Sequence, residues 1–166
     1  MKNTLLRGVA VAAMAIGLAG FGAGIAQATE YINSKSKPLT VVGYGSTGYG
    51  YGDWKVSTGS DGTRSRLSGY QRLNDSDNHK VYMGLETWVN AGACVSGDLL
   101  DCTQAYYYYA STTTSHTNSS AYVNKKATTG LTAAADYARA AVRVSLDIPW
   151  RTDQHGGWAY TDGNKY

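Results

Sequence analysis

The most regular pattern in this chain is an alternation of apolar and polar side chains over residues 138–148. One side of the segment carries only apolar residues: Ala138, Ala140, Val142, Val144, Leu146 and Ile148. The other side carries mainly polar ones: Arg139, Arg143, Ser145 and Asp147, with Ala141 as the exception. Successive side chains of a β-strand point to opposite faces, so the pattern predicts a strand with one face in the core. Pro149 then ends the strand, because proline lacks a backbone N–H donor.

A second alternation, over residues 81–89, predicts another strand of the same kind. Its core face would hold Val81, Met83, Leu85, Thr87 and Val89. Its outer face would hold Tyr82, Gly84, Glu86 and Trp88. We therefore expect Trp88 and Tyr82 to lie on one exposed face beside Glu86.

Shorter strands are predicted over residues 39–42, 53–57, 63–73, 104–113 and 121–128. Turn-forming residues separate them, Asp61-Gly62 being the clearest pair, and 121–128 is expected to pair back on 104–113 as a hairpin. In total, about seven to eight short strands with frequent turns predict an all-β protein, a small antiparallel β-sandwich or a barrel.

Glycine and tyrosine dominate residues 43–52. Dense glycine weakens regular structure, so two interpretations stay open: a mobile aromatic loop that contacts a ligand, or a bulged edge strand whose tyrosines cover the backbone. A second tyrosine run, at 106–109, is expected to alternate between the two faces of a strand, with one pair of rings inside and one outside.

The first 28 residues have the order of a secretory signal peptide. Lys2 and Arg7 form a basic start, and no charged side chain follows until Glu30. Ala26-Gln27-Ala28 is a small-x-small site for signal peptidase, so we predict cleavage after Ala28. The alternative is an uncleaved membrane anchor, which needs about 20 apolar residues. Cleavage is favoured because the segment consists largely of Ala and Gly, which gain little from lipid.

The predicted organisation is a signal peptide over residues 1–28, a flexible lead-in over 29–38 and one secreted β domain over 39–166. Two of the 15 Lys and Arg residues, Lys2 and Arg7, lie in the signal segment, so 13 remain against 12 Asp and Glu, a net charge of +1. The longest basic run after residue 28 is Lys125-Lys126. Nucleic-acid binding depends on clustered Lys and Arg, so this class of partner is not expected.

Cys94 and Cys102 are the only cysteines. An even count in an exported chain favours a disulfide between them, closing a turn-rich loop. A metal site is the less favoured alternative, because the two thiols lack further ligands at zinc-type spacing. We expect no metal and no cofactor.

The aromatic composition indicates a binding surface. The single Phe lies in the signal segment, which leaves 14 Tyr and four Trp after it. Indole and phenol rings stack on the apolar faces of sugars, while their polar edges, with nearby Asp or Asn, bond to hydroxyls. The candidate platforms are Trp88 with Tyr82, Trp158 with His155, and Trp54. The competing interpretation is that Tyr simply suits half-exposed sheets.

Catalytic motifs are absent from the sequence. The histidines have no metal-ligand spacing, and neither a nucleophile elbow nor a phosphate-binding loop is present. If the protein were a small hydrolase, the candidate acids would be Glu86 with Asp53 or Asp147. The expectation is that the protein is not an enzyme.

Two resemblances bear on the class of protein. The Ala/Gly-rich leader, the Tyr- and Gly-rich domain and residues 139–149 resemble small uncharacterised secreted proteins of actinobacteria. Residues 115–123 are similar to the His-Ser-x-x-Val hairpin of lactococcin-972-type bacteriocins, which are shorter and lack the disulfide. The first resemblance implies an extracellular protein of a Gram-positive bacterium.

The sequence thus predicts a monomeric, secreted, non-catalytic binding protein for a polysaccharide or cell-wall glycan. The alternatives are a protein-directed agent, either a protease inhibitor or a bacteriocin-like toxin, and a small secreted hydrolase.

Overall fold

The computed structural model describes residues 29–75, 78–90, 94–96, 103–132, 135 and 137–165. Over these residues the protein is all-β, with two antiparallel sheets and no helix, which confirms the predicted fold class. The strands are β1 (Thr29–Ile32), β2 (Leu39–Gly43), β3 (Ser46–Gly59), β4 (Gly62–Asn74), β5 (Lys80–Asn90), β6 (Cys94–Ser96), β7 (Thr103–Gln104), β8 (Tyr107–Thr113), β9 (Val123–Gly130), β10 (Tyr137–Asp147), β11 (Gln154–His155), β12 (Ala159–Tyr160) and β13 (Asn164–Lys165).

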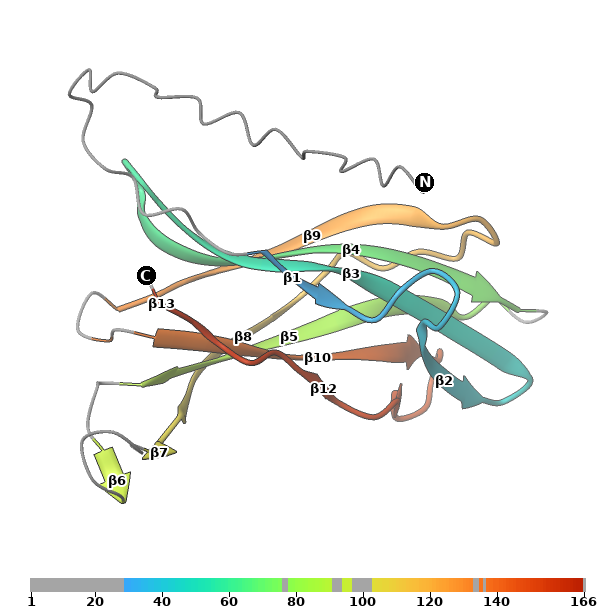
Figure 1. Cartoon of the computed structure of the whole chain (residues 1–166). Helices are drawn as coiled ribbons and strands as arrows, with labels where there is room; N and C mark the ends of the chain where they lie inside the picture. The colour runs from blue at the N-terminus through green and yellow to red at the C-terminus, as the bar shows by residue number, and fades with distance from the viewer. Residues whose placement is uncertain are drawn as a thin grey trace, which may run out of the picture.

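The two sheets pack face to face as a β-sandwich (Figure 1). Sheet I has the order β1-β3-β4-β9, and β2 also pairs with β3. Sheet II has the order β11-β10-β5-β8, and β12 and β13 also pair with β10. Sheet I is the upper layer of Figure 1 and sheet II the lower one, while the small β6–β7 hairpin projects at the lower left. The paired strands leave each sheet open at its edges, so a sandwich describes the fold better than a closed barrel.

Both predicted alternations are confirmed, and together they form the inner face of sheet II. The alternate residues of β5 from Val81 to Val89 are fully buried, as are Ala138, Val142 and Leu146 of β10. Antiparallel pairing of β5 with β10 sets Leu85 opposite Val142. Sheet I covers this surface with its own inward residues: Ile32, Val41, Trp54, Val56, Leu67, Leu73 and Ala127.

The sequence left two interpretations of the glycine-rich segment open, a mobile loop or a bulged edge strand, and both were wrong. Residues 43–45 are the end of β2 and the tight turn after it, and residues 46–52 belong to β3, which has β1 and β2 on one side and β4 on the other. Gly48, Gly50 and Gly52 face the core, where a Cβ added at Gly50 would lie 2.6 Å from Val144 Cγ2. Tyr49 and Tyr51 point the opposite way, to solvent. Glycine therefore lets the two sheets approach closely without interrupting the strand.

Two further expectations about the course of the chain were wrong. The segment expected to be a flexible lead-in starts with β1, which pairs with β3 and places Ile32, 2% exposed, in the core. The segment 121–128 does not pair back on β8, since β9 joins sheet I beside β4. The intervening connection crosses between the sheets, with Val81 N–H donating to Thr117 O and Leu73 N–H to Ser119 O. A local hairpin would need the shortest connection, but the segment that crosses between the sheets closes one side of the sandwich.

The tyrosine run at 106–109 also departs from simple alternation. Tyr107, Tyr108 and Tyr109 are all exposed, at 48%, 51% and 39%. A register shift in the β5–β8 ladder at Thr87/Trp88 breaks the two-residue period here. An irregular ladder leaves an extra residue without a partner, so neighbouring rings lose their strict inside–outside order.

Some predictions fall outside the described residues. The signal peptide, residues 1–28, is one of them. Among the described residues no disulfide is at bonding distance, but Cys102 is not one of them, so the Cys94–Cys102 pair stays a prediction. The described part of the chain contains no helix long and apolar enough to cross a membrane.

Candidate functional site

Each sheet turns one face to solvent, and each of these faces carries aromatic rings beside arginine side chains. We name the outer face of sheet II the tryptophan face; it is formed by Tyr82, Glu86, Trp88, Tyr108, Arg139, Arg143, Trp158 and Tyr160. We name the outer face of sheet I the tyrosine face; it is formed by Tyr49, Tyr51, Lys55, Arg66, Tyr70, Arg72, Tyr122 and Lys126. Strand alternation fixes this division, because residues paired across an antiparallel ladder share a face.

One end of the tryptophan face has a shallow hollow of about 150 Å³ beside Trp158. The guanidinium of Arg143 lies 4.4 Å from the centre of the Trp158 ring, a cation–π contact that holds the indole in place. Tyr82 and Glu86 line the same hollow. At Gly84 an added Cβ would meet nothing closer than Arg143 Cγ at 3.7 Å, so the missing side chain leaves the floor of the hollow low.

The other end of the face is built around Arg139. Its guanidinium lies 4.6 Å from the ring of Tyr106, 5.7 Å from Trp88 and 5.9 Å from Tyr160. Tyr108 meets Trp88 edge-on at 6.0 Å. Trp88 is half-buried, while Tyr108 and Tyr160 are 51% and 60% exposed. The rings are thus fixed by one cation yet still reach the surface.

Tyr82 is a structural support rather than an open platform. It is only 9% exposed, its ring stacks on His116 at 4.6 Å, and its hydroxyl donates to Asp153 Oδ2 at 2.7 Å. Burial, followed by the bond to Asp153, raises the pKa of Tyr82. His155, next to it, bonds to Ser145 Oγ through Nδ1 at 2.9 Å. Burial, followed by the charge of Arg143, lowers the pKa of His155.

The structure therefore places four of the five predicted platform residues on one face, while the fifth lies in the core. Trp88, Tyr82, Trp158 and His155 all belong to sheet II or its edge. The prediction for Trp54 was wrong, because its side chain is 0% exposed and its Nε1 donates to Ser65 Oγ at 2.8 Å inside the core. Trp54 lies on the same face of β3 as Gly50 and Gly52, and that face points inward.

The candidate acids do not form a pair suited to glycoside hydrolysis. Asp53 is on the outer face of sheet I and Glu86 on the outer face of sheet II, on opposite sides of the sandwich. Asp147 shares the outer face of sheet II with Glu86 but pairs with Lys80, six residues away along β5, a separation of about 20 Å. Glycosidase carboxylates lie within about 10 Å of each other.

A buried Ser46–His79–Asp75 cluster has the residue types of a catalytic triad but not its geometry. Ser46 Oγ lies 2.5 Å from His79 Nδ1, Asp75 Oδ1 lies 3.5 Å from that same nitrogen, and Ser46 also donates to Asp75. A triad needs the acid and the nucleophile on opposite ring nitrogens. Ser46 is also fully buried, so the cluster fastens the β4–β5 connection to the start of β3.

The tyrosine face as a whole was not identified from the sequence, where only residues 43–52, with Tyr49 and Tyr51, were considered as a ligand-contacting loop. Tyr51 stacks on Tyr70 with ring centres 5.1 Å apart, and Tyr122 meets Tyr51 edge-on at 5.0 Å. Burial and the neighbouring Tyr70 raise the pKa of Tyr51. The alternation of Arg64, Arg66 and Arg72 in the sequence was the available signal, because residues an even number of positions apart share a strand face.

Within the described ranges, no group of three His, Cys, Asp or Glu side chains is placed to hold a metal ion. Comparison of the chain with protein-family models, with curated proteins and with solved structures finds no match. The two outer faces of the sandwich are therefore the features that bear on function.

Proposed function

We propose that this protein is a secreted, non-catalytic binding protein whose tryptophan face holds a polysaccharide or cell-wall glycan. The observation that carries the proposal is the placement of Trp88 and Trp158 on one open sheet face with Glu86, Arg139 and Arg143 around them. Sugar rings present apolar C–H faces and polar rims. Fixed indole rings next to charged hydrogen-bonding groups match both parts.

The shape of the face favours a polymer over a small molecule. Pockets for small ligands enclose roughly 300–1,000 Å³, whereas the hollow at Trp158 measures about 150 Å³ and opens onto the sheet surface. Gly84, under that hollow, and Trp88 are four residues apart on β5, so the two aromatic positions are separated by about 13 Å. An extended glycan chain can occupy both at once.

The charges on the face suit a ligand without strong net charge. Arg139 and Arg143 of β10 are offset by Glu86 of the neighbouring strand β5, with Asp147 and Asp153 farther along the face. Glu86 accepts hydrogen bonds from sugar hydroxyls and Arg143 donates them, so both kinds of partner lie at the Trp158 hollow.

The test is a pull-down with insoluble polysaccharides and purified cell walls, using the product that a bacterial host secretes from the full-length gene. The mass of that product also tests cleavage after Ala28. We expect saturable depletion that a soluble sugar competes away. Trp88→Ala and Trp158→Ala should each weaken binding at least about tenfold, because buried aromatic contacts carry most of the affinity of such surfaces.

Trp150→Ala is the matched control. Trp150 is fully exposed at 102% and lies in the turn after β10, outside the tryptophan face, so its removal should leave binding unchanged. Thermal unfolding of each variant checks that the fold is intact. Depletion on no matrix, or wild-type binding by both Trp88→Ala and Trp158→Ala, would refute the proposal.

The second candidate is a protein-directed agent, either a protease inhibitor or a bacteriocin-like toxin. It is favoured by the β6–β7 hairpin, which projects from the sandwich and contains Cys94 (Figure 1). A loop closed by the predicted disulfide would be presented rigidly, which lowers the ordering cost of binding. Protease-inhibition and growth-inhibition assays should then show activity that reduction removes; activity that survives reduction counts against this candidate.

A further inference from the structure

The tyrosine face carries an excess of positive charge that the tryptophan face lacks. Its cations are Lys55, Arg66, Arg72 and Lys126, joined at its rim by Lys35 of the β1–β2 connection, against one carboxylate, Asp53. Within the described part of the chain, none of these five cations forms an ion pair; Arg64 at the end of β4 does, with Asp61 at 3.3 Å. The net charge after residue 28 is only +1, so this face concentrates positive charge that the rest of the surface balances.

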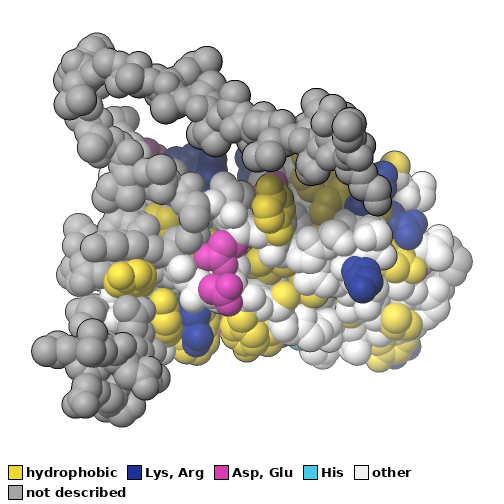
Figure 2. All heavy atoms as spheres, viewed as in Figure 1, with side chains coloured by type: hydrophobic (Ala, Val, Ile, Leu, Met, Phe, Trp, Pro, Cys, Tyr) yellow, Lys and Arg dark blue, Asp and Glu magenta, His cyan; other side chains and the backbone are white. Residues whose placement is uncertain are grey.

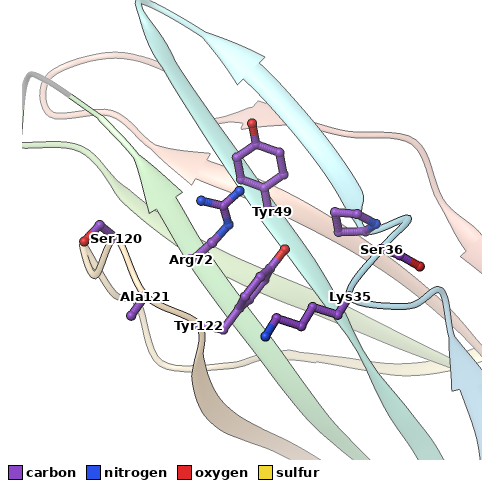
Figure 3. Close-up of a pocket in the computed structure, with 8 residues that line it drawn as sticks. Lys35, Ser36, Tyr49, Arg72, Ser120, Ala121 and Tyr122 are labelled. Atoms are coloured by element: carbon purple, nitrogen blue, oxygen red, sulfur yellow. The ribbon is translucent and has the colours of Figure 1, made fainter.

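The cations surround two hollows along β4. The first, of about 760 Å³, is lined by Lys35 and Arg72 between Tyr49 and Tyr122. Figure 3 shows the Arg72 guanidinium directed toward Tyr49, with Tyr122 on its other side and Lys35 reaching in from the β1–β2 connection. The ring centres lie 4.2 Å and 5.2 Å from the guanidinium carbon. A guanidinium held in this way presents its planar donors in a fixed orientation, which suits the oxygen atoms of a carboxylate or phosphate.

The second hollow, of about 400 Å³, is lined by Lys55, Arg66 and Lys126 with Asp53. Arg66 and Arg72 are six residues apart on one strand, so the two hollows lie about 20 Å from each other. Nε of each arginine is buried and makes no hydrogen bond to a described residue. Figure 2, in the orientation of Figure 1, likewise shows most of its dark-blue side chains toward the upper layer, where sheet I lies, and the acidic ones gathered near its middle.

We propose that the tyrosine face is a second binding site, for a linear carbohydrate polymer that carries repeated anionic groups. The two cationic hollows would each take an anionic group, and the tyrosine hydroxyls between them would bond to the polymer. This site differs from the tryptophan face in place and in chemistry, since it recognises charge rather than the apolar faces of sugar rings.

The arrangement of the tyrosines argues for a carbohydrate polymer over single-stranded nucleic acid. Nucleic-acid surfaces offer open aromatic faces on which bases stack. Here the stack of Tyr51 on Tyr70 and the edge contact with Tyr122 occupy the rings with one another, and Arg72 covers Tyr49. Charge and hydroxyl groups therefore remain as the main means of recognition on this face.

The experiment measures binding of the secreted full-chain product to polygalacturonate, a polycarboxylate, and to poly(glycerol phosphate), a polyphosphodiester, with dextran as the neutral polymer. We expect binding to at least one anionic polymer, and the stronger of the two identifies the anionic group. Binding should fall steeply as salt rises from about 0.02 M to about 0.3 M. Arg72→Gln with Lys35→Gln, and Arg66→Gln with Lys126→Gln, should each reduce affinity at least about tenfold.

Lys80→Gln is the matched control, because it removes one exposed cation from sheet II instead of sheet I. Trp158→Ala should leave polyanion binding unchanged while it weakens neutral-glycan binding, so failure at one face is distinguishable from failure at the other. The proposal is overturned if neither anionic polymer binds at low salt or if the Arg72 and Arg66 variants bind like the wild type. It is also overturned if an oligothymidylate binds at least as tightly as the better polymer.

Discussion

At the scale of single residues, the four tryptophans show that side-chain type alone does not assign a role. Trp54 is fully buried and donates to Ser65, whereas Trp88 and Trp158 lie half-exposed beside arginine side chains, and Trp150 is wholly exposed in a turn. A tryptophan side chain is therefore a core residue, a candidate ligand contact or a solvent-exposed group, according to the direction in which the backbone points it.

The pH dependence of stability is a prediction at this scale. The pKa of His155 is lowered in the folded protein by burial and by Arg143, with Asp153 acting in the opposite sense. Below the ordinary value of 6.5 the unfolded chain therefore binds more protons than the folded one at this position. The stability that His155 contributes above pH 6.5 should therefore be lost as the pH falls below that value.

The check compares thermal unfolding of the wild type and His155→Gln between about pH 7.5 and about pH 5. The variant should lose less stability over this range than the wild type. His79 and His116 are present in both proteins, so their contribution cancels in the comparison. Equal losses in the two proteins would show that His155 does not contribute to the pH dependence.

At the scale of elements, β3 combines two unlike faces within one strand. Its inward glycines let Val144 and Met83 of sheet II pack directly against the backbone, while its outward tyrosines form part of the tyrosine face. Close packing and aromatic display thus arise from the same alternation of glycine and tyrosine. A regular strand between two neighbours also holds these tyrosines more firmly than a loop would.

Gly50→Ala tests the close approach of the sheets. The added Cβ would lie 2.6 Å from Val144 Cγ2 and 3.0 Å from Met83 Sδ, so we expect a loss of about 1–3 kcal/mol in the free energy of unfolding. Urea denaturation measures this loss. The effect should be smaller when Val144→Ala is also present than the two single changes imply.

Gly130→Ala provides the control for this series. A Cβ at Gly130, the last residue of β9, would meet no atom within 4 Å, so stability should change by less than about 0.5 kcal/mol. If Gly50→Ala were as harmless as Gly130→Ala, the inter-sheet spacing would not depend on glycine at this position.

At the scale of the whole molecule, one buried glutamine connects the two sheets to the segment that crosses between them. Gln71 of β4 donates through Nε2 to Val81 O of β5 and to Ser115 O, both at 2.9 Å. Its Oε1 accepts from Thr114 Oγ1 at 2.6 Å. The amide of Met83 in turn donates to Thr114 Oγ1 at 2.9 Å, so the network joins both layers.

Gln71→Leu should therefore cost about 2–4 kcal/mol in the free energy of unfolding, because it removes three buried hydrogen bonds and takes the Gln71 partner from Ser115 O and from the Thr114 hydroxyl. Denaturant unfolding provides the measurement. Asn124→Ala, which removes an exposed bond to Ser68 Oγ, should cost less than about 0.5 kcal/mol. Similar values for the two variants would mean that the buried network contributes little to joining the sheets.

Much of the fold follows from local pattern. Several features were predictable, because the order of apolar and polar side chains shows the two-residue period of a strand. They are the strands at 81–89 and 138–148 with their buried faces, the turn at Asp61-Gly62, and the outer-face positions of Trp88, Tyr82 and Glu86. Expectations failed where the answer depended on distant partners: the pairing of β9, the central place of β3, and β1 in the supposed lead-in.

The all-β class, and the face on which most side chains of the long strands lie, follow from the amino-acid sequence, because alternation is a local property of the backbone. Contacts between distant segments, by contrast, turn the glycine face of β3 inward with Trp54 and place Arg72 between Tyr49 and Tyr122. Those neighbours come from separate strands and connections, and which strands meet depends on the shared burial of both sheets rather than on any one segment.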